Sequence, residues 1–160
     1  MTGARASEPE QRPLPEALAD IAEDFRAMSV NDRLQLLLEF SEGLPRLPER
    51  YADHPELMEP VPECQSPVFL LTEVDDDPAS TVHLHFSAPR EAPTTRGFAG
   101  ILREGLDGLP AAELLAAPDD VSSRLGLERA VSPLRLRGMA GMLGRIKRQV
   151  REKTGGLSPR

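Results

Sequence analysis

Apolar residues recur at helical spacing through the first third of the chain. The first helix should begin near Leu14, with Pro15 in its first turn, where the missing proline N–H costs nothing. Its apolar face consists of Leu18, Ile21, Ala22, Phe25 and Met28. Ser29 followed by Asp32 is typical of a helix N-cap and predicts a second helix that stops at Gly43. The apolar positions of that helix are Leu34, Leu37, Leu38 and Phe40.

The middle of the chain has the pattern of strands. Residues 68–74 form a compact apolar run with several β-branched side chains, and residues 81–86 alternate strictly between apolar and polar positions. The aspartate-rich segment 75–78 between them is a turn, so the two runs should form an antiparallel hairpin. A short third strand near residues 59–61 would enlarge this sheet, and one turn of helix is expected near residues 49–51.

Helical periodicity returns after the hairpin, over residues 94–106, 111–115, 120–125 and 138–152. The core stripe of the last helix is Met139, Met142, Leu143, Ile146 and Val150. This order predicts an α+β fold with two N-terminal helices, a small antiparallel sheet of two or three strands, and C-terminal helices packed on one side of the sheet. We expect one domain over residues 14–153, a disordered tail over 1–13 and a flexible C-terminal tail over 154–160.

Composition limits the class of protein. The 160 residues suffice for one core, which must be built from aliphatic side chains because aromatic residues make up only 4% of the chain. The single cysteine cannot form an internal disulfide, and no apolar run approaches the length of a membrane span. The N-terminus also lacks the charged-then-apolar pattern of a signal segment. These features predict a soluble cytoplasmic protein.

Charge is unevenly distributed along the chain, whose formal net charge is −7. Basic residues gather near the C-terminus, where Glu152 is the only acidic residue among Arg135, Arg137, Arg145, Lys147, Arg148, Arg151 and Lys153. Nucleic-acid binding is one interpretation of such a patch, but the acidic remainder and the scarcity of aromatic residues speak against it. A solvated helix face, or a docking surface for an acidic protein partner, fits the pattern better.

Cys64 is the most informative residue of the chain. Cysteines used for packing usually lie within an apolar stripe, whereas Cys64 has polar neighbours and lies close to Pro60, Pro62 and Pro67. Prolines fix their own φ and bias the preceding residue toward extended backbone. The segment should therefore be a stiff, non-helical projection that presents a thiol, which suggests nucleophilic or carrier chemistry at sulfur.

Two other groups of polar residues have simpler explanations. His83 and His85 share one face of the predicted second strand and form a geometrically feasible metal pair, but they lack a third ligand, so we expect histidines that face solvent. The run Asp75–Asp77 fits a hairpin turn better than a cation site. We therefore expect neither a metal nor a cofactor.

Three motifs in register resemble those of SufE, the sulfur-acceptor family of iron–sulfur cluster assembly. A Cys-x-Ser-x-Val-aromatic run enters a strand over residues 64–69, an Arg-Gly pair opens a helix at 96–97, and a Ser-Pro-x-Arg-x-x-Gly run covers 132–138. Order and spacing agree from about Leu14 to Arg151. The resemblance implies a SufE/NifU-like fold and a sulfur-accepting role for Cys64.

The chain departs from the family pattern at two positions beside the cysteine. Glu63 replaces the usual glycine and Phe69 replaces the usual tryptophan. Loss of the glycine reduces the conformational freedom of the loop, and a carboxylate close to sulfur disfavours the thiolate.

The resemblance also implies a reaction and its partners. A pyridoxal-phosphate cysteine desulfurase, SufS-like, would hold sulfur as a persulfide, and the thiolate of Cys64 would attack the outer sulfur and carry it to a SufB- or SufBCD-like scaffold. The acceptor would also stimulate the desulfurase, without being an independent enzyme. Arg135 matches an important family arginine and is expected either to stabilise the thiolate or persulfide or to tie the last helix to the loop. A monomer or a weak homodimer is expected, docking through the cysteine loop and the basic last helix.

Two other functions compete with the carrier. An IscU/NifU-like cluster scaffold is disfavoured because thiolate-ligated clusters normally take four ligands and this chain has one cysteine. A non-covalent regulator of a desulfurase, docking through the last helix, would keep its effect when Cys64 is replaced by serine.

Overall fold

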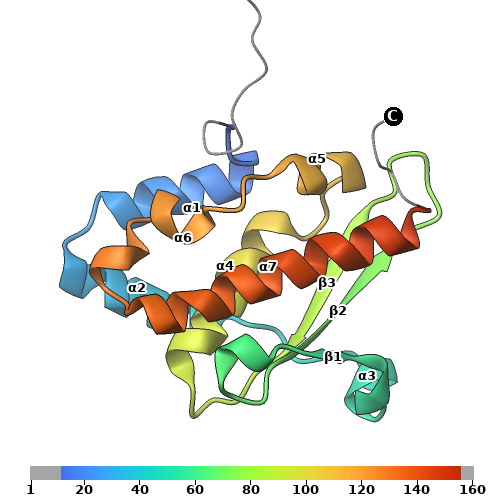
Figure 1. Cartoon of the computed structure of the whole chain (residues 1–160), viewed down its shortest axis with the longest axis horizontal. Helices are drawn as coiled ribbons and strands as arrows, with labels where there is room; N and C mark the ends of the chain where they lie inside the picture. The colour runs from blue at the N-terminus through green and yellow to red at the C-terminus, as the bar shows by residue number, and fades with distance from the viewer. Residues whose placement is uncertain (1–11, 156–160) are drawn as a thin grey trace, which may run out of the picture.

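The computed structural model describes residues 12–155, which form an α+β fold (Figure 1). In chain order its helices and strands are α1 Glu16–Arg26, α2 Val30–Glu42, α3 Glu49–Ala52, β1 Glu59–Pro60, β2 Phe69–Val74, β3 Val82–Ser87, α4 Pro93–Leu106, α5 Ala111–Ala116, α6 Val121–Arg124 and α7 Pro133–Lys153. The predicted order of two N-terminal helices, a small antiparallel sheet and C-terminal helices is confirmed.

The sheet has the order β1-β2-β3, with both pairs antiparallel. The hairpin register places Leu70 opposite Phe86 and Thr72 opposite Leu84, so the buried positions of the two strands coincide on one face. The predicted third strand is present as the two-residue β1, in which Glu59 is opposite Leu70. This short edge strand leads directly into the cysteine segment.

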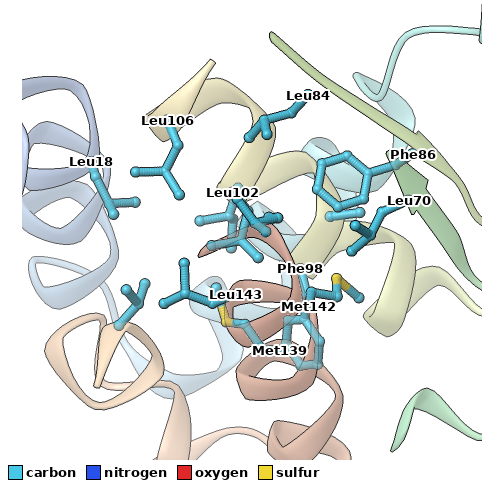
Figure 2. Close-up of a cluster of buried hydrophobic side chains, with 14 of the residues drawn as sticks. Leu18, Leu70, Leu84, Phe86, Phe98, Leu102, Leu106, Met139, Met142 and Leu143 are labelled. Atoms are coloured by element: carbon cyan, nitrogen blue, oxygen red, sulfur yellow. The ribbon is translucent and has the colours of Figure 1, made fainter. Parts of the chain in front are cut away.

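Helices α4 and α7 cover the buried face of the sheet (Figure 1). Figure 2 shows side chains from α1, α4, α7 and the sheet meeting in one cluster around Leu102, Phe98 and Met142. The predicted core stripe of α7 is confirmed, because all five of its residues are buried. Polar contacts tie the same helix to the sheet, since Thr72 donates through its backbone N–H, at 2.8 Å, to the Oε1 atom of buried Gln149.

The N-terminal helices follow the sequence pattern closely. The Ser29 hydroxyl accepts a hydrogen bond from the Asp32 N–H at 3.2 Å, which confirms the predicted cap, and α2 ends at Gly43. Among the apolar positions of α2, Leu37 is buried, whereas Leu34 and Leu38 are 38% and 37% exposed. Helix α2 packs on α4 through Leu37 and Phe40, which lie against Gly97 and Gly100.

Helix α7 begins five residues earlier than the sequence predicted. Its N-cap is Ser132, whose hydroxyl accepts from the Arg135 N–H at 3.3 Å, and Pro133 occupies the first turn. The third motif is therefore the first turn of the helix rather than a loop before it.

The two predicted tails fall almost entirely on residues 1–11 and 156–160, which lie outside the described residues. No helix between residues 12 and 155 is both long and apolar enough to cross a membrane.

Candidate functional site

Cys64 ends a tight 3-10 turn, Pro62–Cys64, which we call the cysteine turn. The Cys64 N–H donates to the Val61 carbonyl at 3.0 Å, and the Gln65 N–H donates to the Pro62 carbonyl at 3.0 Å. Gln65 then adopts a φ of 57°, a left-handed conformation that is uncommon for a residue with a side chain. The turn is closed at its base, where the Val61 N–H donates to the Val68 carbonyl at 2.9 Å.

The prediction of a non-helical projection that presents the thiol is wrong. The proline at position 62 starts a 3-10 turn, and Cys64 is half-buried because the turn folds back onto α7 (Figure 1). Its Sγ lies 3.7 Å from the Gly138 carbonyl oxygen. A Cβ atom at Gly138 would lie 3.0 Å from this sulfur and 3.3 Å from the Cys64 Cα, so only glycine fits here without displacing the turn.

A second glycine of α7 receives the neighbouring side chain. A Cβ atom at Gly141 would lie 2.9 Å from the Cδ and 3.2 Å from the Cβ of Glu63. Gly138 and Gly141 lie three residues apart on one helix face, so at these two positions the cysteine turn packs directly on the helix backbone. The final glycine of the third motif thus has a defined role, which is to admit the cysteine.

Arginines of the same helix hold the acidic residues around the turn. Arg145 contacts Glu63 at 2.9 Å through Nη1 and Glu59 at 3.2 Å through Nε. Arg148 also pairs with Glu59, and Gln149 donates to Glu59 at 2.9 Å. A continuous polar network therefore runs along α7 from buried Thr72 of β2, through Gln149, to Glu63 beside Cys64.

Burial and charge keep the thiol protonated. Burial raises the pKa of Cys64 to about 11, with a further contribution from the Glu63 carboxylate, while the Arg145 guanidinium acts in the opposite direction. The hydrogen bond from Arg145 in turn holds the pKa of Glu63 below its usual value. Because the thiolate is the reactive form, Cys64 in this arrangement is a poor nucleophile at neutral pH.

Arg145 is the functional-site residue that sequence reasoning missed. It lies seven residues after Gly138, on the same helix face, and this spacing together with Glu63 beside the cysteine was the available signal. Arg135 is exposed on the first turn of α7, and its side chain makes no hydrogen bond or ion pair with any residue between 12 and 155. Its predicted role at sulfur stays a prediction.

Four of the seven cations in the basic C-terminal segment make polar contacts within the fold, three of them with carboxylates. Arg145 and Arg148 pair with acidic residues of β1 and the cysteine turn, Lys147 is buried and contacts Asp119 at 2.8 Å, and Lys153 donates to the Thr72 carbonyl. Within residues 12–155, the cations of the segment whose side chains lack such contacts are Arg135, Arg137 and Arg151. The surface available to an acidic partner is therefore smaller than the sequence suggests.

The second motif, Arg96-Gly97, connects α4 to the ends of β3 and α2. Arg96 donates to the carbonyls of Ala88 at 2.6 Å, Ser41 at 2.8 Å and Leu44 at 3.3 Å, so it joins the end of β3 to the end of α2. A Cβ atom on Gly97 would lie 2.6 Å from the Leu37 carbonyl oxygen. The pair permits the close approach of α2 and α4.

The two strand histidines each pair with a carboxylate. His83 contacts Asp75 at 2.8 Å, and His85 contacts Glu73 at 2.8 Å. The prediction that both face solvent is only partly correct, because the side chain of His85 is 16% exposed and packs against Tyr51 with 5.1 Å between the ring centroids. No group of three or more metal-ligating residues occurs in the described part of the chain.

Known proteins are similar to this chain in sequence and in fold. Residues 19–150 match the family described as "SufE: Fe-S metabolism associated domain". An uncharacterized SufE-like protein of Mycobacterium tuberculosis strain H37Rv is 57% identical over 139 residues, which cover 87% of this chain and 94% of that protein. SufE-like protein 1, chloroplastic/mitochondrial, of Arabidopsis thaliana is 26% identical over 131 residues, 81% of this chain and 33% of that protein. The solution structure of a hypothetical protein from Thermus thermophilus superimposes with a TM-score of 0.78 at 36% identity, over 90% of this chain and 100% of the other.

Proposed function

Because the chain belongs to the SufE family of Fe-S metabolism associated domains, we propose that it accepts sulfur from a cysteine desulfurase on Cys64, stimulates that enzyme, and passes the sulfur to an iron–sulfur cluster scaffold. The observation that carries the proposal is the placement of the chain's one cysteine. Cys64 ends a surface turn seated on two glycines of α7, in a motif of the family.

The chemistry needs one thiol and no external redox agent. The Cys64 thiolate attacks the outer sulfur of the desulfurase persulfide, a new S–S bond forms on Cys64, and the bond to the desulfurase breaks. The electron pair of that bond remains on the desulfurase cysteine, which leaves as a thiolate, so no net oxidation occurs. The persulfide proton stays with the transferred sulfur or passes to the departing thiolate.

Since burial raises the pKa of Cys64 to about 11, the proposal includes a change at the site when a partner binds. A thiol at that pKa is ionised only to about one part in a thousand at pH 8, which is too little for efficient attack. A cation brought near the sulfur would favour the thiolate and the terminal persulfide anion. Arg135, exposed on the first turn of α7, is the residue we propose for this role in the docked complex.

Docking should use the face that carries the cysteine turn and the start of α7. Arg135 and Arg137 supply positive charge there, and Leu134 is 49% exposed beside them. These three side chains suit a partner surface with acidic groups around an apolar patch. The same face would meet the scaffold after sulfur transfer.

Intact-mass spectrometry tests the proposal directly. The protein is incubated with its own organism's cysteine desulfurase and free cysteine, then analysed without reductant beside a Cys64→Ser variant. We expect a reducible gain of one or more sulfur atoms on the wild type only, together with faster desulfurase turnover. Absence of a sulfur gain on the wild type would refute the carrier function, and stimulation by both proteins would identify a non-covalent regulator.

A further inference from the structure

Glu63 occupies the position where the family pattern has glycine, and the structure uses its side chain. Among the described residues that have a side chain, positive φ occurs only at Gln65 and Ser80, so position 63 needs none of the freedom of a glycine. The carboxylate reaches across to α7 instead, where both of its oxygens lie close to Arg145 Nη1, at 2.9 and 3.0 Å.

This ion pair is the main polar connection between the cysteine turn and α7. The backbone hydrogen bonds of the turn are made within the turn and to Val68, so they do not attach it to the helix. Between residues 12 and 155, the other polar contact from the turn to α7 is the thiol at 3.7 Å from the Gly138 carbonyl, a long and weak interaction. Packing against Gly138 and Gly141 orients the turn but supplies no charge.

We propose that Glu63 and Arg145 are positioning residues that hold the cysteine turn closed on α7, and that sulfur acceptance by Cys64 begins when this pair is opened. The inference rests on the proposed function. It concerns Glu63, which stands where the family pattern has glycine. In this proposal the ion pair limits the access of a partner to the thiol.

The surroundings of the pair make it accessible to a partner. An open hollow lies alongside it, lined by Glu59, Glu63, Gly141, Gly144, Arg145 and Arg148. The Glu63 side chain is 40% exposed, so a protein docked over the hollow reaches the pair without unfolding a helix or strand. Arg145 remains held by Glu59 when Glu63 leaves, so opening the pair frees the turn and keeps the arginine in place.

Alkylation of Cys64 by iodoacetamide tests the inference in the isolated protein. We expect Glu63→Gln to raise the alkylation rate at pH 8 by about two- to fivefold, because the contribution of a partly exposed ion pair corresponds to a factor of about five at most. Glu59→Gln is the matched control, since it removes a carboxylate from the same arginine and leaves Glu63 paired. An equal rate in Glu63→Gln and the wild type, or an equal increase in the control, would overturn the proposal.

Hydrogen exchange separates opening of the turn from a change in thiol ionisation. Glu63→Gln removes a charge that raises the pKa of Cys64, whereas Arg145→Met removes one that lowers it. The two variants therefore shift the ionisation in opposite directions, yet both should accelerate exchange of the amides over residues 61–68. Unchanged exchange in both variants would contradict the proposal even if alkylation were faster.

The inference and the proposed function can fail separately. If a persulfide forms on wild-type Cys64 but Glu63→Gln and the wild type do not differ in alkylation or exchange, the carrier function is supported. The positioning role of Glu63 and Arg145 is then refuted. Faster alkylation and exchange in Glu63→Gln, with no sulfur gain on either protein, would keep the pair and reject the carrier. Melting curves of each variant verify that the fold is intact.

Discussion

Two glutamates, Glu63 and Glu73, are each held by an arginine, yet their surroundings differ. Glu73, on the outer face of β2, accepts hydrogen bonds from Arg50 at 3.0 Å and from Tyr51, and it contacts His85 at 2.8 Å. Glu63 has Arg145 alone as its side-chain partner among the described residues. One carboxylate has three partners from two segments, and the other has one.

The pKa values follow this difference in partners. Burial acts to raise the pKa of Glu73, but hydrogen bonds from Arg50, Tyr51 and His85 outweigh it and lower the value to about 2. The pKa of Glu63 is lowered less strongly, through the hydrogen bond from Arg145. Glu73, with three donors, therefore attaches α3 to the sheet more firmly than Glu63, with one donor, attaches the cysteine turn to α7.

Of the substitutions that test this comparison, we expect replacement of Glu73 to change the stability of the protein most. Glu73→Gln should lower the free energy of unfolding by about 1 to 3 kcal/mol, because a partly screened acceptor for three donors is lost. The melting temperature should fall by about 3 to 9 °C, while alkylation of Cys64 stays unchanged. Asp75→Asn, which affects one exposed pair with His83, is the control and should change stability little. Faster alkylation of Cys64 in Glu73→Gln, with an unchanged melting temperature, would contradict the anchor role.

Acid should weaken the same anchor. A carboxylate whose pKa falls on folding stabilises the protein above its unfolded pKa, and this contribution is lost as the pH falls toward its folded pKa. For Glu73 that window runs from about 4.5 down to about 2. Urea denaturation between about pH 6 and pH 2.5 should show stability declining with acid, and less steeply in Glu73→Gln. The comparison with the variant is needed because Glu56, Glu59, Glu63 and Asp77 also have lowered pKa values. Equal slopes in the two proteins would contradict the assignment.

Gly138→Ala should have a smaller effect on stability, and this effect should be confined to the contact between the cysteine turn and α7. The added methyl group would lie 3.0 Å from the Cys64 sulfur, and the overpacking should disfavour the closed turn by about 1 to 2 kcal/mol. Faster alkylation of Cys64 is the expected readout, with the melting temperature nearly preserved because alanine favours the helix. Gly144→Ala is the matched control on the same helix, since a Cβ atom there meets nothing within 4 Å. Similar alkylation rates in both variants would show that the turn does not rest on Gly138.

Much of this protein could be predicted from its sequence, because helices and strands follow local periodicity. The cap at Ser29, the alternation that places Val82, Leu84 and Phe86 on one face of a strand, and the apolar stripe of α7 all depend on neighbouring residues, and the structure confirms them. Three short motifs were sufficient to indicate the family, because their order and spacing are properties of the chain alone.

The orientation of the thiol depended on the tertiary structure. Proline spacing indicates a stiff segment but not the direction in which it turns, and here it folds onto a helix that lies 74 residues further along the chain. The pairing of Glu63 with Arg145, 82 residues apart, has the same origin. Burial, ion pairs and pKa shifts arise between segments that only the packed core brings together, so the resting state of Cys64 could not be read from local pattern.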